Sequence, residues 1–286
     1  FIVLLAFIFL GFPIFMSLLI TGILFLTLGG NSLGLTVIKM FGSANSLSLL
    51  AIPYFVIAGN IIMKARITDK LVNFADAAVG WLPGGLGHVN VLTSMIFGGI
   101  QGSGCADAAA IGGMLIPAME KQGYDKDYSV AVTAGSSMLS PIIPPSIAMI
   151  LYSYYTEVPV GRLFMGALVP GIFLGLLQMG VVYLEYRLRK YDIPRTRFSL
   201  RNLLTTAWHS LGALMMPLII LSGICFGIVT PTESGVLAIL YGLLYGFCIS
   251  KTLKWSDIPG ILIDSAVTTS VVYMTIVGAG VLSNVL

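Results

Sequence analysis

Apolar segments long enough to cross a lipid bilayer recur along the whole chain, and this pattern limits the possible folds more than any other feature. They fall at roughly 1–28, 47–63, 88–118, 129–155, 162–186, 207–229, 234–250 and 260–286. Charged residues make up 9% of the chain, against about 25% in an average soluble protein. Because about 20 apolar residues span the hydrocarbon core, we expect an all-α polytopic membrane protein whose first partner is the lipid bilayer.

The first apolar segment is interrupted by "GFP" at 11–13. Proline removes a backbone donor and glycine loosens a helix, so this segment is either one kinked span or two spans joined by a tight turn. We favour two, because the segments from 207 onward then repeat the same order around the "TPT" turn at 230–232. Five crossings would precede 207, so the second set starts from the opposite face, as in an inverted-topology repeat.

Two further expectations follow from this repeat. Ten residues before the "GFP" turn reach only about 15 Å as a helix, too short for a span, and the last residues, "VGAGVLSNVL", lie within an apolar run. The chain is therefore expected to be truncated at both ends. A second hairpin is expected to lie beyond residue 286.

Segment 88–118 is too long for one straight span. Its 31 residues would reach about 46 Å as a helix, against a hydrocarbon core of about 30 Å. A re-entrant hairpin that enters and leaves by one face puts thirteen of the fifteen basic residues on that face and only Lys39 and Arg162 on the other. A full crossing would divide them eleven to four. The positive-inside rule therefore favours a hairpin that opens to the cytoplasm.

The expected hairpin tip lies in "GGIQGSGCADAAAIGG" at 98–113. Gly102 and Gly104 free the backbone, Ser103 offers a hydroxyl, and Asp107 begins the returning half-helix. Irregular backbone at membrane depth is tolerated where it is buried in protein or lines a polar cavity, and broken helices there bind ions through carbonyls and helix N-termini. Two alternatives stay open: the glycines could serve close helix packing, and Asp107 could cap its own helix.

A second break is expected in the span 129–155, within "AGSSMLSPIIPPSIAMILY". Three prolines in five residues cannot sit in a regular helix, because each removes a donor and frees carbonyls upstream. We expect the carbonyls of about Ser140 to Pro144 to be unpaired beside the hairpin tip. A simple proline kink is the alternative.

The remaining polar residues of the spans offer no catalytic set. Asn60 either hydrogen-bonds a neighbouring helix or lies near the cation site, and Glu233 is expected to cap a helix. The two histidines lie at span entrances, and the three cysteines lack paired spacing. We therefore expect no enzyme activity and, since the basic residues lie between spans without interleaved aromatics, no nucleic-acid binding.

The sequence resembles the large membrane subunit (M subunit) of TRAP transporters, the tripartite ATP-independent periplasmic transporters of the ion-transporter superfamily. The resemblance is carried by "AIPYFVIAGNIIM", the stretch from "GWLPGGLGHVNV" through "QGSGCADAAAIGG" to "SPIIPPSIAMILYSY", "LFMGALVPG" and "GIVTPTESGVLA", in that order. It implies an elevator-type, inverted-repeat fold in a bacterial inner membrane and symport with Na+. It also implies two protein partners, a small membrane subunit and an extracytoplasmic substrate-binding protein that delivers an organic acid such as a C4-dicarboxylate, a sialate or a related sugar or keto acid.

Carried over by position, the resemblance implies a division of the chain. Residues 1–87 would form scaffold helices and the connecting arm of the first repeat, and 88–161 the transport-domain elements. Residues 162–206 would hold a span and a basic cytoplasmic loop, and 207–286 the start of the second repeat. The alternative within the superfamily is a receptor-independent sodium-coupled organic-anion symporter.

The resemblance also implies sites between the hairpin tip and the broken helix. The hypothesised sodium ligands are Gly102, Ser103, Gly104, Ser140, Ile143, Pro144 and Asn60. The hypothesised substrate pocket comprises Gln101, Ser103, Asp107, Ser136, Ser137, Pro145 and Ser146. The chain departs from the family at the tip, where Gln101 replaces a serine and Cys105 replaces a small or apolar residue. The second sodium site is expected beyond residue 286.

Overall fold

The computed structural model describes residues 2–30, 33–189, 191, 193 and 198–283, and these residues form helices and no strand. The helices are α1 Ile2–Phe9, α2 Ile14–Leu28, α3 Leu33–Ala44, α4 Ala51–Lys64, α5 Ile67–Val79, α6 Gly85–Gln101, α7 Gly104–Lys121, α8 Lys126–Ser137, α9 Ile147–Thr156, α10 Val160–Arg189, α11 Leu200–Cys225, α12 Pro231–Leu244 and α13 Ile258–Ser283. Three short turns accompany them: η1 Ser48–Leu50, the π-turn η2 Tyr245–Ile249 and η3 Trp255–Asp257.

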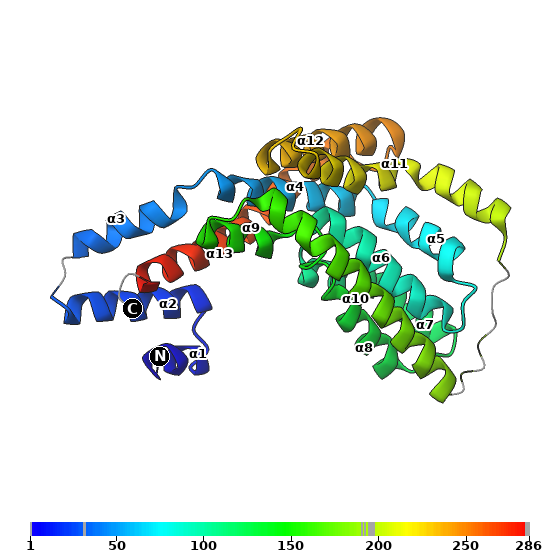
Figure 1. Ribbon diagram of the computed structural model, residues 1–286, viewed down its shortest axis with the longest axis horizontal. Coiled ribbons are helices and arrows are strands. Elements are labelled where there is room, and N and C mark those ends of the chain that lie inside the picture. The colour runs from blue at the N-terminus through cyan, green and yellow to red at the C-terminus, as the bar shows by residue number, and fades with distance from the viewer. Residues whose placement is uncertain (1, 31–32, 190, 192, 194–197, 284–286) are drawn as a thin grey trace.

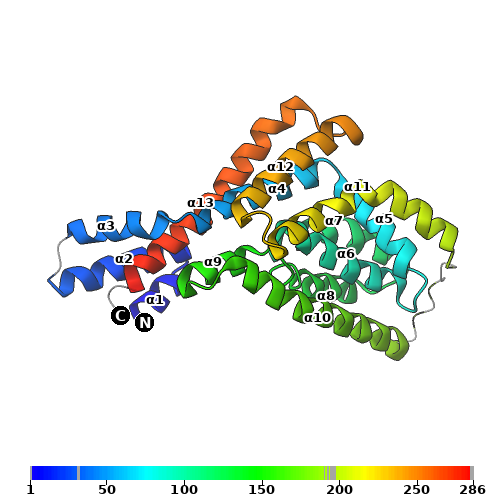
Figure 2. The same cartoon turned by 45° about the horizontal axis from the view of Figure 1, so that its top comes forward.

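The helices form two limbs joined by a central layer (Figure 1). One limb holds α1, α2 and α3 with the end of α13, which packs between α2 and α3. The other holds α5 to α8 with α10 and part of α11. Helix α4 crosses the centre, where it packs on α12 and α13 (Figure 2). The hairpin of α6 and α7 and the first half of the broken helix, α8, therefore lie in one limb, and α6 and α9 both contact the central helix α4.

Only some helices in the described part of the chain are long and apolar enough to cross a bilayer alone. These are α10, α11, α12 with its π-turn, and α13 with η3. A fifth span arises if the bent pair 36–44 and 48–64 is counted as one, with an angle of 60° between its halves. The chain is thus a multi-pass membrane protein, as predicted.

The break at "GFP" is present, because α1 ends at Phe9 and α2 begins at Ile14. The connection left between the apolar segments 1–28 and 47–63, however, is largely helical. Helix α3 occupies most of it, since the twelve residues Leu33–Ala44 carry a single charge, Lys39, and no proline. Glycine and polar residues at 29–32 and 45–46 mark only its two ends.

The segments 88–118 and 129–155 are both interrupted where the sequence predicts. Helices α6 and α7 are separated by Gly102 and Ser103 alone, and α8 and α9 by the irregular stretch 138–146. Glycine with φ of 64° at position 102 ends α6. The three prolines end α8 and delay the start of α9 to Ile147.

The turn at "TPT" confirms the role predicted for Glu233. Thr230 accepts a hydrogen bond from the backbone N–H of Glu233 (3.3 Å), and the Glu233 carboxylate accepts from the backbone N–H of Thr230 (2.7 Å). Together with Pro231 at the first helical position, this reciprocal pair fixes the start of α12. It also separates α11 from α12 sharply enough for the two to pack against each other.

Candidate functional site

The tip between α6 and α7 lies directly against the break between α8 and α9. A Cβ added at Gly102 would collide with the carbonyl oxygen of Pro145 and would lie 2.7 Å from the Cα of Ser146. A Cβ at Gly104 would lie 3.0 Å from the carbonyl oxygen of Ser137. The predicted proximity of the two interrupted elements is therefore confirmed, and glycine at the tip is required by backbone contact.

Helices α6 and α7 run back alongside each other from this tip. Asn90, twelve residues before Gly102, donates a hydrogen bond to Thr133 of α8 (2.7 Å). Gly112, ten residues after it, lies against the same Thr133, whose methyl carbon would be 3.0 Å from an added Cβ. Since both arms meet one residue of α8, α6 and α7 form a helical hairpin. Its depth in a bilayer stays a prediction.

Asp107 of α7 is fully buried, and neither of its carboxylate oxygens has a hydrogen-bond partner among the described residues. Its carboxylate faces the hydroxyls of Ser94 on α6 and Ser140 in the break. The Ser140 hydroxyl is also buried without a partner. Burying an unpaired charge costs several kcal/mol or more, so this carboxylate requires a proton or a bound cation.

The helix-cap alternative for Asp107 is not supported. Asp107 is the fourth residue of α7, and its backbone N–H donates to the Ser103 carbonyl (3.0 Å) as part of the helix. Ser103, at the N-cap position, makes no side-chain capping hydrogen bond either. The carboxylate points instead to the interface of the hairpin with the break.

A hydrogen-bond network joins α6 of the hairpin to α8, next to the Asp107 carboxylate. The Ser136 hydroxyl donates to the Asn90 carbonyl oxygen (2.8 Å), and the Ser94 hydroxyl contacts Ser136 Oγ at 3.2 Å. Asn90 closes the network by donating to Thr133. All four side chains are buried, so the network fixes the register of α6 on α8 and places Ser94 beside Asp107.

Replacing Asn90 with alanine should destabilise the folded protein by about 1–2 kcal/mol, the range given for hydrogen bonds between membrane helices. The reason is that Thr133 would lose its hydrogen-bond donor on α6 and the Ser136 hydroxyl would lose its acceptor there. The check is thermal unfolding of the purified protein, with Asn202→Ala as the control because residue 202 is exposed at the start of α11. Equal melting temperatures for the two variants would contradict the network.

The other residues predicted for the site lie around the same interface. Among the described residues, no hydrogen bond reaches the carbonyl oxygens of Ser140, Ile143 or Pro144, as predicted for a span broken by prolines. Pro141 departs from the prediction, because its carbonyl accepts a hydrogen bond from the Ser146 hydroxyl (2.5 Å). The same Ser146 oxygen accepts the N–H of Met149 and caps α9. Three carbonyls are thus available to a ligand.

Gln101, Ser137 and Asn60 each make contacts other than those predicted for the site. The side-chain amide oxygen of Gln101, Oε1, is buried without a hydrogen-bond partner in the described chain. The same side chain packs on Gly59 of α4. The Ser137 hydroxyl donates to the Ala134 carbonyl of its own helix (2.9 Å). Asn60 donates to Ser265 of α13 (2.8 Å), which is the helix-neighbour alternative left open by the sequence.

The donor set suits a small hard cation. Carboxylate, hydroxyl and carbonyl oxygens are the ligands that such cations prefer, and here Asp107 and Ser140 each offer a side-chain oxygen without a partner. The described residues contain no cluster of three or more His, Cys, Asp or Glu side chains that could hold a metal ion. A site for Na+ therefore fits the chemistry of the residues present.

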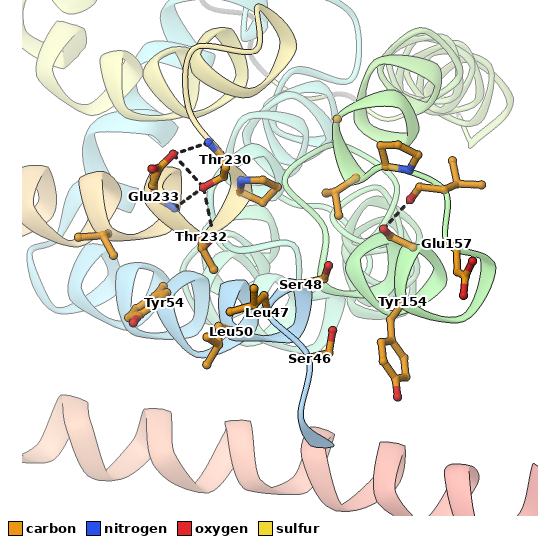
Figure 3. A pocket seen from close by; sticks show the side chains of 17 residues that line it. Ser46, Leu47, Ser48, Leu50, Tyr54, Tyr154, Glu157, Thr230, Thr232 and Glu233 are labelled. Carbon is orange, nitrogen blue, oxygen red and sulfur yellow. Dashed lines mark hydrogen bonds between the residues drawn. The ribbon is translucent and has the colours of Figure 1, made fainter. Parts of the chain in front are cut away.

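A separate cavity lies at the other end of α9. It has a volume of about 890 Å³ and is lined by three connections, 46–50, 153–161 and 230–233. Figure 3 shows Thr230 and Glu233 on one side and Tyr154 and Glu157 on the other. The ten residues of α9 place about 15 Å between this cavity and the hairpin tip. It was not predicted from the sequence, and it holds none of the predicted site residues.

Asn90, Ser94 and Thr133 were also not predicted. A signal was present, since Asn90 and Ser94 are four residues apart in an apolar segment and therefore share one helix face. Thr133 stands in the same relation to Ser137 and, one turn earlier, to Ser129. Polar residues with helical spacing inside a span thus mark the interface that the hairpin uses.

Comparison with known proteins assigns the family. The family model for the DctM component of the tripartite ATP-independent periplasmic (TRAP) transporters matches residues 1–286. The chain belongs to this family. The predicted resemblance is therefore confirmed over the full sequence.

Curated relatives with an assigned role agree with the family model, and a third relative is uncharacterized. The chain is 35% identical over 249 residues to the C4-dicarboxylate TRAP transporter large permease protein DctM of Pseudomonas aeruginosa, covering 87% of this chain and 58% of that protein. It is 34% identical over 270 residues to the sialic acid TRAP transporter permease protein SiaT of Haemophilus influenzae, covering 94% and 44%. The uncharacterized protein YgiK of Salmonella typhimurium is 39% identical over 239 residues, with 83% and 54% covered.

These relatives bear on two further expectations. The chain spans about half the length of the curated relatives it matches. The two with an assigned role are transporter permeases, which fits the expectation that the chain is not an enzyme. The hairpin and broken helix described above therefore belong to a TRAP large-permease sequence.

Proposed function

We propose that this chain is the membrane permease part of a sodium-coupled TRAP transporter that imports an organic acid across a bacterial inner membrane. The observation that carries the proposal is the buried, unpaired carboxylate of Asp107 between the hairpin tip and the proline-rich break. A bound Na+ would supply the positive charge that this carboxylate lacks. Hydroxyl and carbonyl oxygens of Ser140, Ile143 and Pro144 would complete its surroundings.

Two helix N-termini would bind the anionic substrate. Helix α7 begins at Gly104 and α9 at Ile147, and a Cβ at Gly102 would lie 3.1 Å from the backbone nitrogen of Ile147. Both N-termini therefore converge on the tip, and each carries partial positive charge and free N–H groups that favour a carboxylate. Ser103, Ser136, Ser137, Pro145 and Ser146 would border this substrate position.

The substrate class is proposed from the relatives. Their names include C4-dicarboxylate, sialic acid and 2,3-diketo-L-gulonate transporters, all of which carry an organic acid. An extracytoplasmic substrate-binding protein would deliver the acid, and a small membrane subunit would complete the assembly. The limb that holds the hairpin would move as a unit against the other helices, which is the elevator mechanism.

Uptake of labelled organic acids into proteoliposomes tests this proposal. The full-length protein and its small subunit are reconstituted, an inward Na+ gradient is imposed, and the purified substrate-binding protein is added or left out. We expect uptake that requires both the gradient and the substrate-binding protein. Sodium-driven uptake without the binding protein would favour the receptor-independent symporter, and uptake without sodium dependence would contradict the cation site.

A further inference from the structure

An apolar groove of about 600 Å³ lies between α4, the end of α12 and the start of α13, far in sequence from the hairpin. Its lining includes Ile57 and Ile61 of α4, Leu243 of α12, and Ile258 and Leu262 of α13, and no lining residue is charged. Helices α12 and α13 are candidate membrane spans, and α4 is part of the bent pair. The groove between them is therefore an apolar surface within the membrane-spanning part of the chain.

An aromatic pair stands at one end of the groove. Phe247 of the π-turn and Trp255 of η3 both line it, and their rings stack with centroids 4.7 Å apart. Trp255 is 80% exposed. Tryptophan is enriched where the hydrocarbon core meets the headgroups, so this end of the groove is expected to lie at the membrane–water interface.

Cations gather at the same end. Lys64 lies one helical turn beyond Ile61, and Lys251 and Lys254 belong to the connection between α12 and α13. The Thr252 hydroxyl donates to the Ala65 carbonyl (2.8 Å) and holds this connection against the end of α4. The three lysines are therefore brought together from two elements nearly two hundred residues apart.

The charge of these lysines is not compensated within the described chain. All three are exposed, and none forms an ion pair with a described residue. The neighbouring carboxylate of Asp257 accepts the backbone N–H of Lys254 (3.0 Å) and so serves the start of η3. Arg66 adds a further exposed cation beside Ala65, with Asp69 one turn later on α5.

We propose that this groove is a specific site for an anionic phospholipid. One acyl chain lies in the apolar groove, and the phosphate is bound by Lys64, Lys251 and Lys254 beside Trp255. The acyl chain of a lipid is already in hydrocarbon before it enters the groove, so apolar burial provides little driving force and the groove alone would not select a headgroup. Cations near the membrane surface attract anionic lipids, and this attraction provides the selectivity for the headgroup.

A partner helix would fit an apolar groove equally well, but it would leave the lysines unmatched. A phosphate accepts several hydrogen bonds from ammonium groups and also neutralises them. The proposal concerns only the described helices and their membrane position, and it is independent of which acid is transported. In the folded protein, the lipid would tie the connection between α12 and α13 to the end of α4.

Fluorescence of Trp255 offers a direct test. The full-length protein carrying Trp81→Phe and Trp208→Phe retains tryptophan 255 of this chain as the reporter, with any tryptophan outside residues 1–286 also replaced. It is reconstituted in phosphatidylcholine bilayers in which brominated phosphatidylglycerol or brominated phosphatidylcholine forms the same minor fraction. We expect quenching to report binding of the brominated phosphatidylglycerol that is at least about fivefold tighter, the factor that corresponds to about 1 kcal/mol from a single lysine.

Two charge variants separate the specific site from general attraction to the surface. Substituting Lys64, Lys251 and Lys254 with glutamine should abolish the preference for phosphatidylglycerol over phosphatidylcholine. Lys121→Gln with Lys126→Gln removes exposed charge from another basic connection and should leave the preference unchanged. Equal quenching by the two lipids, an unchanged preference in the triple variant, or no quenching by either lipid because protein covers the groove, would each overturn the proposal.

Discussion

Replacing Asp107 with asparagine should remove the response of the protein to sodium. Wild-type protein is expected to melt at a higher temperature in Na+ than in choline, because a cation that binds only the folded state stabilises it by about 2.7 kcal/mol at one hundred times its Kd. The variant lacks the buried charge that requires the cation. It should melt at one temperature in both salts, and in choline it should be more stable than wild type.

The same variant should lose sodium-driven uptake by at least about a hundredfold. Loss of an outer-shell partner of a bound metal already costs about 10- to 100-fold in affinity or activity, and Asp107 is proposed as a direct ligand. Initial uptake rates in proteoliposomes measure this effect. Asparagine has almost the same shape as aspartate, so the hairpin should stay packed on α8.

Asp127→Asn is the matched control, since it makes the same change at an exposed position in the first turn of α8. It should keep both the sodium response and the uptake. If wild-type protein were stabilised by acid in place of sodium, a proton would be the partner of Asp107. If Asp107→Asn retained the sodium response, the cation site would have to lie elsewhere.

The positions of the breaks were predictable because local chemistry determines them. Three prolines within residues 141–145 remove the backbone donors that a regular helix needs, and glycine at position 102 permits the positive φ at which α6 ends. The capping box of Thr230 and Glu233 is likewise a local pattern. That the two interrupted elements meet followed from their need for a shared polar environment within an apolar protein.

Other features depend on contacts that the sequence does not record. The segment 33–44 has apolar residues at helical spacing, but the helix that packs on it, α13, lies more than two hundred residues later in the chain. The direction of the Asp107 side chain depends on the register of α6 on α8, which Asn90 and Ser136 determine. From the sequence, Asn60 could equally have been near the cation site, but in the structure it donates a hydrogen bond to Ser265 on α13.

Substituting Gly102 with alanine should disrupt the contact between the hairpin tip and the break. At φ of 64° an added Cβ costs about 1–2 kcal/mol, and here it would also collide with the Pro145 carbonyl and approach the Cα of Ser146. Backbone atoms cannot rotate away as a side chain can, so overpacking adds about 1–3 kcal/mol. Thermal unfolding should show a loss of about 2–5 kcal/mol in total, and sodium-driven uptake should be lost.

Gly113 of α7 and Gly135 of α8 provide the controls for this substitution. A Cβ at either position meets no atom within 4 Å, and both lie inside helices, where alanine is more favourable than glycine by about 0.5–1 kcal/mol. Gly113→Ala and Gly135→Ala should therefore raise stability slightly and preserve uptake. Comparing Gly102→Ala with these two variants shows whether the tip requires glycine because of its close contact with the break. If all three variants behaved alike, the close approach of the tip to the break would not matter for folding, and the cation site built on that approach would lose its structural basis.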